Sequence, residues 1–120
     1  MNKPGRLTTH VLDTALGKPA AGLKIDLYWI ENEERQHITT VTTNSDGRVD
    51  GALVEGVGFM PGVYELVFHA GDYLRATGAA VTEPAFLDRI PLRFGAADPS
   101  SHYHVPLLLS AYSYSTYRGS

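Results

Sequence analysis

The chain has 120 residues, of which 43% are hydrophobic and 19% charged, and it carries a formal net charge of −3. These values are typical of one globular domain that buries roughly two-thirds of its unfolded surface. The acidic balance argues against a nucleic-acid partner. The absence of cysteine excludes disulfides, thiolate metal ligands and a thiol nucleophile.

The ends of the sequence suggest a simple domain organisation. Residues 1–6 read as a short flexible leader, and residues 7–120 are expected to form a single domain without internal repeats. No segment has the length and hydrophobicity of a signal peptide or a membrane span, and the final Arg-Gly-Ser is not a peroxisomal signal. We therefore expect a cytoplasmic protein without a membrane partner.

Alternating hydrophobic residues predict strands through the first half of the chain. The alternation in 7–12 places Thr8 and His10 on the same strand face, and 23–29 has the pattern of a half-buried strand. Asp46 and Gly47 give a strong hairpin signal. The other expected elements are a turn region at 13–22, a charged loop at 31–35, an exposed strand at 36–43 and a strand at 49–54.

The second half of the chain continues the β pattern with one exception. A glycine-rich loop at 55–62 precedes an alternating strand at 63–69, and Asp72 is expected to cap a short helix that ends at Gly78. Further strands are expected around 92–94 and in the terminal pair that begins at His102. Seven or eight short strands with a single helix predict an all-β sandwich.

Three histidines are candidates for chemistry. His102 and His104 lie two residues apart, so both point to one strand face and can converge on a substrate or a metal. Of the two, His104 is expected to be the more enclosed. His10 could complete a three-histidine zinc site, although a lone strand histidine is usually structural or exposed. The remaining two, His37 and His69, are expected on the surface.

Arginine and tyrosine side chains provide further candidates. Arg48 directly follows the Asp-Gly turn, so its guanidinium could bind a planar anionic or carbonyl-rich ligand, although a solvated hairpin arginine is the commoner case. Arg118 could add positive charge at the same place. Tyrosines at the chain end suit either an ordinary strand or a ligand pocket. No phosphate-binding glycine loop, Gly-x-Ser-x-Gly elbow or catalytic glutamate pair is present.

The string YSYSTYRGS at the chain end, with HVPLLLS just before it, resembles the 5-hydroxyisourate hydrolases, the enzyme branch of the transthyretin family. Three further strings, THVLDTALGKPAAGLKIDLY, TNSDGR and PGVYELVFHAGDYL, extend the resemblance to nearly the whole chain. The resemblance implies a transthyretin-like, eight-stranded β-sandwich with one short helix. It also implies a homotetramer, assembled as a dimer of dimers, whose active sites lie where dimers meet.

The resemblance further implies a cofactor-free hydrolase that converts 5-hydroxyisourate to 2-oxo-4-hydroxy-4-carboxy-5-ureidoimidazoline in urate degradation. His104 would activate water and His10 would position water or substrate, although these two roles could be exchanged. The alternative is the carrier branch, which would bind a planar aromatic ligand in the tetramer channel without turnover. The catalytic set implied for the enzyme is His10, Arg48, His104 and Ser120, and the substrate-binding set is His10, Arg48, Tyr117, Arg118 and Gly119.

Overall fold

The computed structural model describes residues 5–119. Ser120 and the first four residues of the predicted leader therefore lie outside the described residues. Gly5 and Arg6, the last two residues of that leader, are hydrogen-bonded into the fold. The Gly5 amide donates to the Pro99 carbonyl (2.9 Å), and the Arg6 amide donates to the Ser101 carbonyl (3.2 Å).

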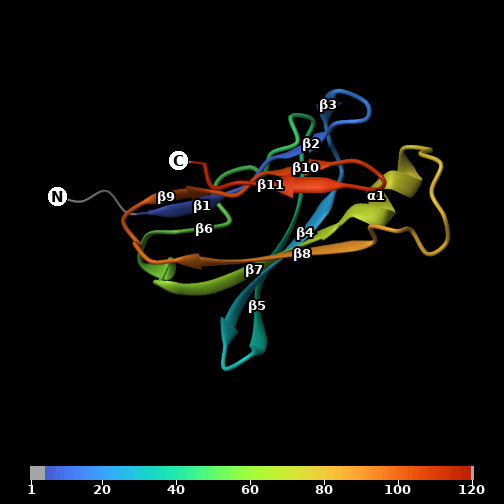
Figure 1. Ribbon diagram of the computed structural model, residues 1–120. Helices are drawn as coiled ribbons and strands as arrows, with labels where there is room; N and C mark the ends of the chain where they lie inside the picture. The colour runs from blue at the N-terminus through green and yellow to red at the C-terminus, as the bar shows by residue number, and fades with distance from the viewer. Residues whose placement is uncertain (1–4, 120) are drawn as a thin grey trace.

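The described residues form short strands, one 3-10 turn and one α-helix (Figure 1). In chain order they are β1 (Arg6–Thr8), β2 (Val11–Asp13), β3 (Lys18–Pro19), β4 (Lys24–Glu31), β5 (Glu34–Thr42), β6 (Val54–Glu55), η1 (Gly56–Gly58), β7 (Gly62–His69), α1 (Ala70–Ala76), β8 (Arg89–Ala96), β9 (His102–His104), β10 (Leu107–Leu109) and β11 (Tyr114–Thr116).

One layer of the sandwich is an antiparallel sheet with the strand order β5-β4-β7-β8. The β4–β5 hairpin projects beyond the body of the molecule (Figure 1). Its turn consists of Asn32 and Glu33, which both have positive φ angles (53° and 67°). The charged loop predicted at 31–35 is therefore a two-residue turn, because Glu34 and Arg35 already belong to β5.

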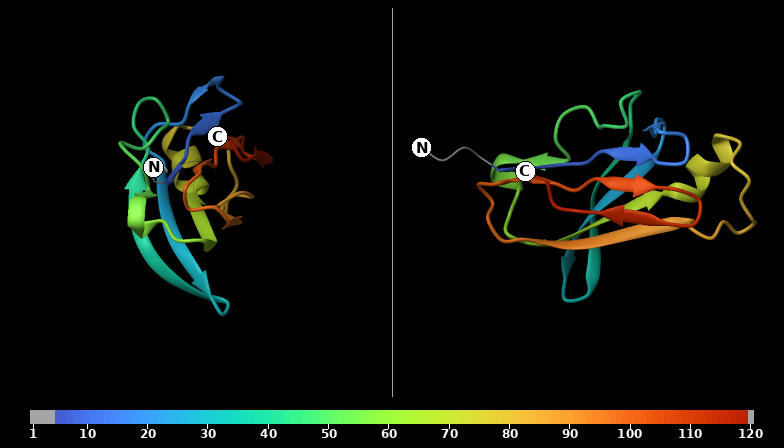
Figure 2. Two further views of the ribbon diagram at one scale, coloured as in Figure 1. Left: turned by 90° about the vertical axis from the view of Figure 1, so that its left-hand side faces the viewer. Right: turned by 45° about the horizontal axis from the view of Figure 1, so that its top comes forward.

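The other layer is built on two segments from opposite ends of the chain. β1 pairs with β9 and β2 pairs with β10, both in parallel. Thr8 lies opposite His104 and Val11 lies opposite Leu107, so the register is the same in both pairs. β6 flanks β1, and β11 flanks β10 in the predicted terminal pair. Figure 2 shows this layer lying over the first sheet.

The two parallel pairs form one continuous ladder. Between them the Val105 amide donates to the Thr8 carbonyl (2.9 Å), and the Leu107 amide donates to the His10 carbonyl (2.8 Å). Pro106 lacks an N–H group and interrupts the assigned strands at this point. When β1 and β2 are counted as one strand, and β9 and β10 as another, the predicted eight-stranded sandwich is confirmed, with the two-residue β3 added beside β2.

Because side chains alternate along each strand, every second side chain points into the core between the layers. Leu7, Thr9 and Val11 point inward and are buried. Thr8 and His10 lie on the same strand face, as predicted, and this face is the outer one, where both are half-buried. A buried hydrogen bond from the Tyr73 hydroxyl to Asp13 Oδ2 (2.8 Å) joins α1 to β2. The largest fully buried side chains are Tyr64, Phe59, Phe68, Leu7, Leu23, Ile25, Leu27, Leu66, Ile90, Leu107, Leu109 and Val11.

Two predicted elements differ from the structure. The helix starts after His69 rather than at a capping Asp72, which lies within the first turn and pairs with Arg75 (2.8 Å). Its predicted end is confirmed, since Gly78 has a φ of 80°. The strand predicted at 49–54 is reduced to β6, because Gly51 has a φ of 76° and turns the chain.

His69 also departs from its prediction, whereas His37 is exposed as expected. His69 is only 9% exposed, and its Nε2 atom lies 2.7 Å from Asp26 Oδ2. Every residue of β7 from Tyr64 onward is buried, and His69 is the last of them.

Among the described residues, no helix is long and apolar enough to cross a membrane.

Candidate functional site

The candidate site lies on the outward face of the β1–β9 ladder. Thr8, His102 and His104 project from this face, because Leu7, Tyr103 and Val105 occupy the alternate, inward positions. A cleft of about 380 Å³ opens there. It is lined by Arg6, Thr8, Thr9, Arg48, Val49, Gly51, His102 and His104.

His104 is held from two sides. Its Nδ1 atom lies 2.8 Å from the Thr8 hydroxyl, and its backbone forms a bridge with Gly119. In that bridge the Gly119 amide donates to the His104 carbonyl (2.6 Å), and the His104 amide donates to the Gly119 carbonyl (3.3 Å). Among residues 5–119, Nε2 of His104 has no hydrogen-bond partner. This nitrogen is therefore the ring atom that is left available for a ligand or a water molecule.

Arg48 reaches the site through a tight turn. The Asn44 side chain closes this turn by accepting hydrogen bonds from the Asp46 amide (2.9 Å) and the Arg48 amide (3.2 Å). Directly after this turn, Arg48 forms an antiparallel backbone bridge with His10. The predicted Asp-Gly turn thus fixes the backbone of Arg48 beside His10. His10 in turn lies near His104, with 6.5 Å between the two ring centroids.

Positive charge surrounds the site. Within residues 5–119, Arg6, Arg48 and Arg118 have no carboxylate partner, whereas the arginines of the other layer are paired. Burial and the Arg48 guanidinium lower the pKa of His10 and of His104 below 6.5. Burial, Arg6 and Arg118 lower the pKa of His102 in the same direction. All three rings are therefore neutral at pH 7 and able to accept protons.

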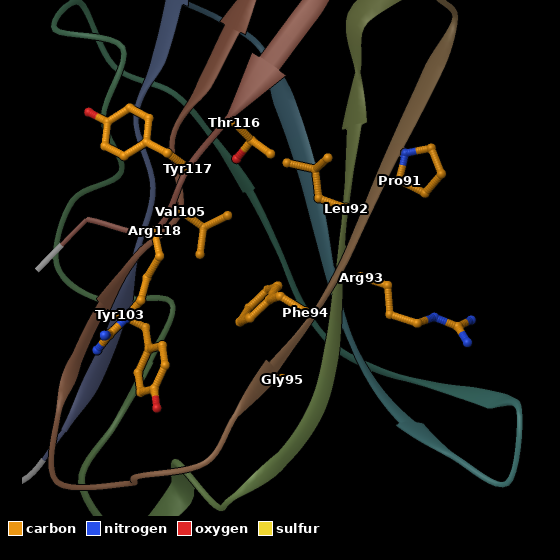
Figure 3. A pocket seen from close by; sticks show the side chains of 10 residues that line it. All are labelled: Pro91, Leu92, Arg93, Phe94, Gly95, Tyr103, Val105, Thr116, Tyr117 and Arg118. Atoms are coloured by element: carbon orange, nitrogen blue, oxygen red, sulfur yellow. The ribbon is translucent and has the colours of Figure 1, made fainter.

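Tyr117 and Arg118 line a second cavity, of about 440 Å³, between the two layers (Figure 3). Its walls are mostly apolar and come from β8, β9 and the chain end. The Arg118 guanidinium lies 4.3 Å from the Tyr103 ring centroid, and Tyr117 is 59% exposed. The structure thus brings together four of the predicted site residues, namely His10, Arg48, His104 and Gly119. It places Tyr117 and Arg118 at the neighbouring cavity. Ser120 lies outside the described residues.

The described residues do not assemble the three-histidine zinc site that the sequence left open. No group of three His, Cys, Asp or Glu side chains within residues 5–119 is arranged to hold a metal ion. The ring centroids of His102 and His104 are 6.2 Å apart. The Thr8 hydroxyl lies between the two rings and contacts one nitrogen of each.

The sequence interpretation missed Thr8 and Arg6 as parts of this site. The alternation did place Thr8 on the same face as His10, but no local pattern indicated its contact with His104, which is 96 positions away in the chain. Arg6 was assigned to the leader, although its backbone pairs with β6 and β9. A neutral base, a nearby guanidinium and an open cleft together suit the attack of water on a polar carbonyl substrate.

These features define a small β-sandwich protein with a histidine- and arginine-lined cleft on one outer face. The chain belongs to the HIUase/Transthyretin family, whose model matches residues 7–119. It is 71% identical to "5-hydroxyisourate hydrolase 2" of Rhizobium meliloti (strain 1021) over 120 residues, which is 100% of both chains.

Solved structures give the same fold. A crystal structure of (S)-allantoin synthase matches with a TM-score of 0.93 and 44% identity, over 99% of this chain but only 45% of that one. Sea bream transthyretin in complex with thyroxine matches with a TM-score of 0.85 and 26% identity, over 95% of this chain and 94% of that one. Fold alone therefore does not separate the enzyme branch from the carrier branch, whereas sequence identity favours the enzyme branch.

Proposed function

We propose that this chain hydrolyses 5-hydroxyisourate to 2-oxo-4-hydroxy-4-carboxy-5-ureidoimidazoline, a step of urate degradation. The observation that carries the proposal is the His104 ring, which is held at Nδ1 while Nε2 has no partner among the described residues. Arg48 lines the same cleft. The full-length similarity to a protein named 5-hydroxyisourate hydrolase 2 supports the same substrate.

Opening a ring amide needs a base for water, stabilisation of the oxyanion and a proton for the leaving nitrogen. His104 Nε2 takes the proton from the attacking water. The Arg48 guanidinium binds substrate oxygens and the negative charge that develops on the carbonyl oxygen. His10, whose ring centroid lies 6.5 Å from that of His104, positions water or substrate. The proton that His104 has taken from water is then delivered to the leaving nitrogen, which restores the neutral base. No step calls for a cofactor.

The chain end completes this proposal. Gly119 supports the His104 ring through the backbone bridge. Arg118 adds positive charge beside His102, and Tyr117 contacts the flat substrate ring. Tyr117 lines the edge of the neighbouring cavity, and its ring points away from the interior of that cavity (Figure 3). Ser120 would orient a histidine through its hydroxyl or its carboxylate.

A homotetramer, built as a dimer of dimers, is part of the same proposal. The cleft lies on an outward face of the sandwich, and within residues 5–119 β8 and β11 are edge strands, which can pair with a strand of another chain. Sedimentation or light scattering tests this assembly, and a monomer that retains full activity would contradict it. The cytoplasmic location is likewise proposed, and fractionation of cells that produce the protein tests it.

The direct test is the ultraviolet decay of 5-hydroxyisourate, generated in place by urate oxidase, in the presence of a chelator. We expect the protein to accelerate the decay and His104→Ala to lose about 100- to 10,000-fold of that activity while remaining folded. Folded wild-type protein without acceleration would overturn the proposal and favour the carrier alternative. Activity that requires added zinc would favour the three-histidine hypothesis instead.

A further inference from the structure

The Thr8 hydroxyl lies between two histidine rings in the cleft. Its oxygen is 2.6 Å from Nε2 of His102 and 2.8 Å from Nδ1 of His104. The backbone holds this arrangement, because Thr8 is the parallel partner of His104 and its carbonyl accepts a hydrogen bond from the Val105 amide (2.9 Å). All three side chains line the same cleft.

One hydroxyl proton cannot serve both rings. If Thr8 donates to one histidine, it can only accept from the other, so at least one of the two contacting nitrogens must carry a proton. The tautomer of a histidine is set by the hydrogen bond that its other nitrogen makes. Thr8 therefore couples the tautomers of His102 and His104.

The lengths of the two contacts give this coupling a direction. The shorter contact, at His102, suits an O–H donor, whereas 2.8 Å at His104 is within the range of an N–H donor. Burial, Arg6 and Arg118 lower the pKa of His102, so this ring can be neutral, as this direction requires. A neutral His102 can accept the Thr8 proton at Nε2, which leaves the Thr8 oxygen to accept from His104.

We propose that Thr8 is a positioning residue, which donates to His102 and accepts from Nδ1–H of His104, and so keeps Nε2 of His104 unprotonated in the cleft. The catalytic meaning of this tautomer rests on the proposed function, in which His104 Nε2 is the base. When His104 becomes positively charged during the reaction, the hydrogen bond from Nδ1–H to Thr8 strengthens.

The first test does not depend on activity. Nitrogen-15 NMR of the histidine side chains, recorded where the rings are neutral, should show His104 protonated at Nδ1 in the wild type. Thr8→Val should remove this preference, Thr8→Ser should keep it, and Thr42→Val, an exposed threonine in β5, should not change it. A wild-type His104 protonated at Nε2, or a Thr8→Val protein with the wild-type tautomer, would overturn the proposal.

The second test uses turnover and separates the two proposals. Wild-type protein that does not accelerate the decay refutes the proposed function, while the NMR result still decides the role of Thr8. With active wild type, Thr8→Val should lower kcat by about 10- to 100-fold, the loss that also follows removal of a group that orients a metal-bound histidine. Thr8→Ser should rescue most of it.

The His104→Ala background provides the control for mechanism. If Thr8 acts through His104, adding Thr8→Val to His104→Ala should cause no further loss of kcat. An additive loss would contradict a positioning role, as would a Thr8→Ser protein that is as impaired as Thr8→Val. Thermal unfolding of each variant verifies that the compared proteins are folded.

Discussion

Gly119→Ala tests how closely the chain end positions His104. A Cβ atom at Gly119 would lie 3.1 Å from both Cβ and Cδ2 of His104 and 3.4 Å from Cγ. Because carbon atoms pack best at about 3.5–4.0 Å, one side must give way by about 0.4 Å. The two backbone hydrogen bonds between these residues transmit part of that shift to the ring.

The loss of activity can be scaled from this displacement. A misplacement of 1 Å can cost about 100-fold in rate, so a shift of about 0.4 Å predicts a loss of roughly five- to tenfold in kcat. Thermal unfolding should hardly change, because Gly119 joins the fold through an isolated bridge outside the named strands.

The assay is the 5-hydroxyisourate decay at saturating substrate, with Gly58→Ala as the matched control. A Cβ at Gly58 would meet only Val54 Cγ2, at 3.7 Å, so this variant should have wild-type kcat. A Gly119→Ala protein with wild-type kcat and an unchanged melting temperature would refute the reasoning, since the ring would then not depend on contact with the chain end.

Three further predictions concern pH, stability and the chain end. Because burial and Arg48 lower the pKa of His10 and His104, the acid limb of kcat/KM should fall below pH 6.5, and an acid limb above 6.5 would contradict this. The free energy of unfolding should also decrease as pH drops from 6.5, since the unfolded chain then binds more protons than the folded one. Tyr73→Phe removes the buried hydrogen bond to Asp13 and should cost about 1–3 kcal/mol in urea unfolding without changing kcat; unchanged stability would show that the bond contributes little. Deletion of residues 118–120 should abolish turnover while leaving the fold intact by circular dichroism, and an active deletion variant would exclude the chain end from the site.

Local patterns predicted most of the fold. Alternation correctly placed Thr8 and His10 on one strand face, because successive side chains of a strand point to opposite faces. That this face is the outer one, with Leu7 and Val11 buried on the other, is a finding of the structure. The same reasoning failed at 49–54, where hydrophobic residues suggested a strand but Gly51 turns the chain. It also failed for His69, because burial there depends on the pairing of β7 and on the hydrogen bond to Asp26.

The candidate site was only partly predictable, because its key contacts are not local. The Asp-Gly turn places Arg48, and this can be read from four consecutive residues. The pairing of Thr8 with His104 joins segments 96 residues apart and in parallel, and no turn or spacing specifies it. The resemblance of the chain end to a known family supplied candidates, but the Thr8 contact appears only when the register of β1 and β9 is known.

The distribution of arginines connects the acidic chain to a positive site. Arg35 and Arg93 pair with Glu65, whereas Arg75 and Arg89 pair with carboxylates near α1. These four charges are therefore largely neutralised. The remaining arginines, Arg6, Arg48 and Arg118, have no such partner within residues 5–119, and all three lie around the histidine rings. A chain with net charge −3 thus gathers those of its arginines that lack a carboxylate partner among the described residues at one place. Burial and these arginines together lower the pKa of the three histidines, and the arginines also attract electron-rich carbonyl oxygens. Neutral histidines and an attraction for carbonyl oxygens are the two conditions that the proposed hydrolysis requires.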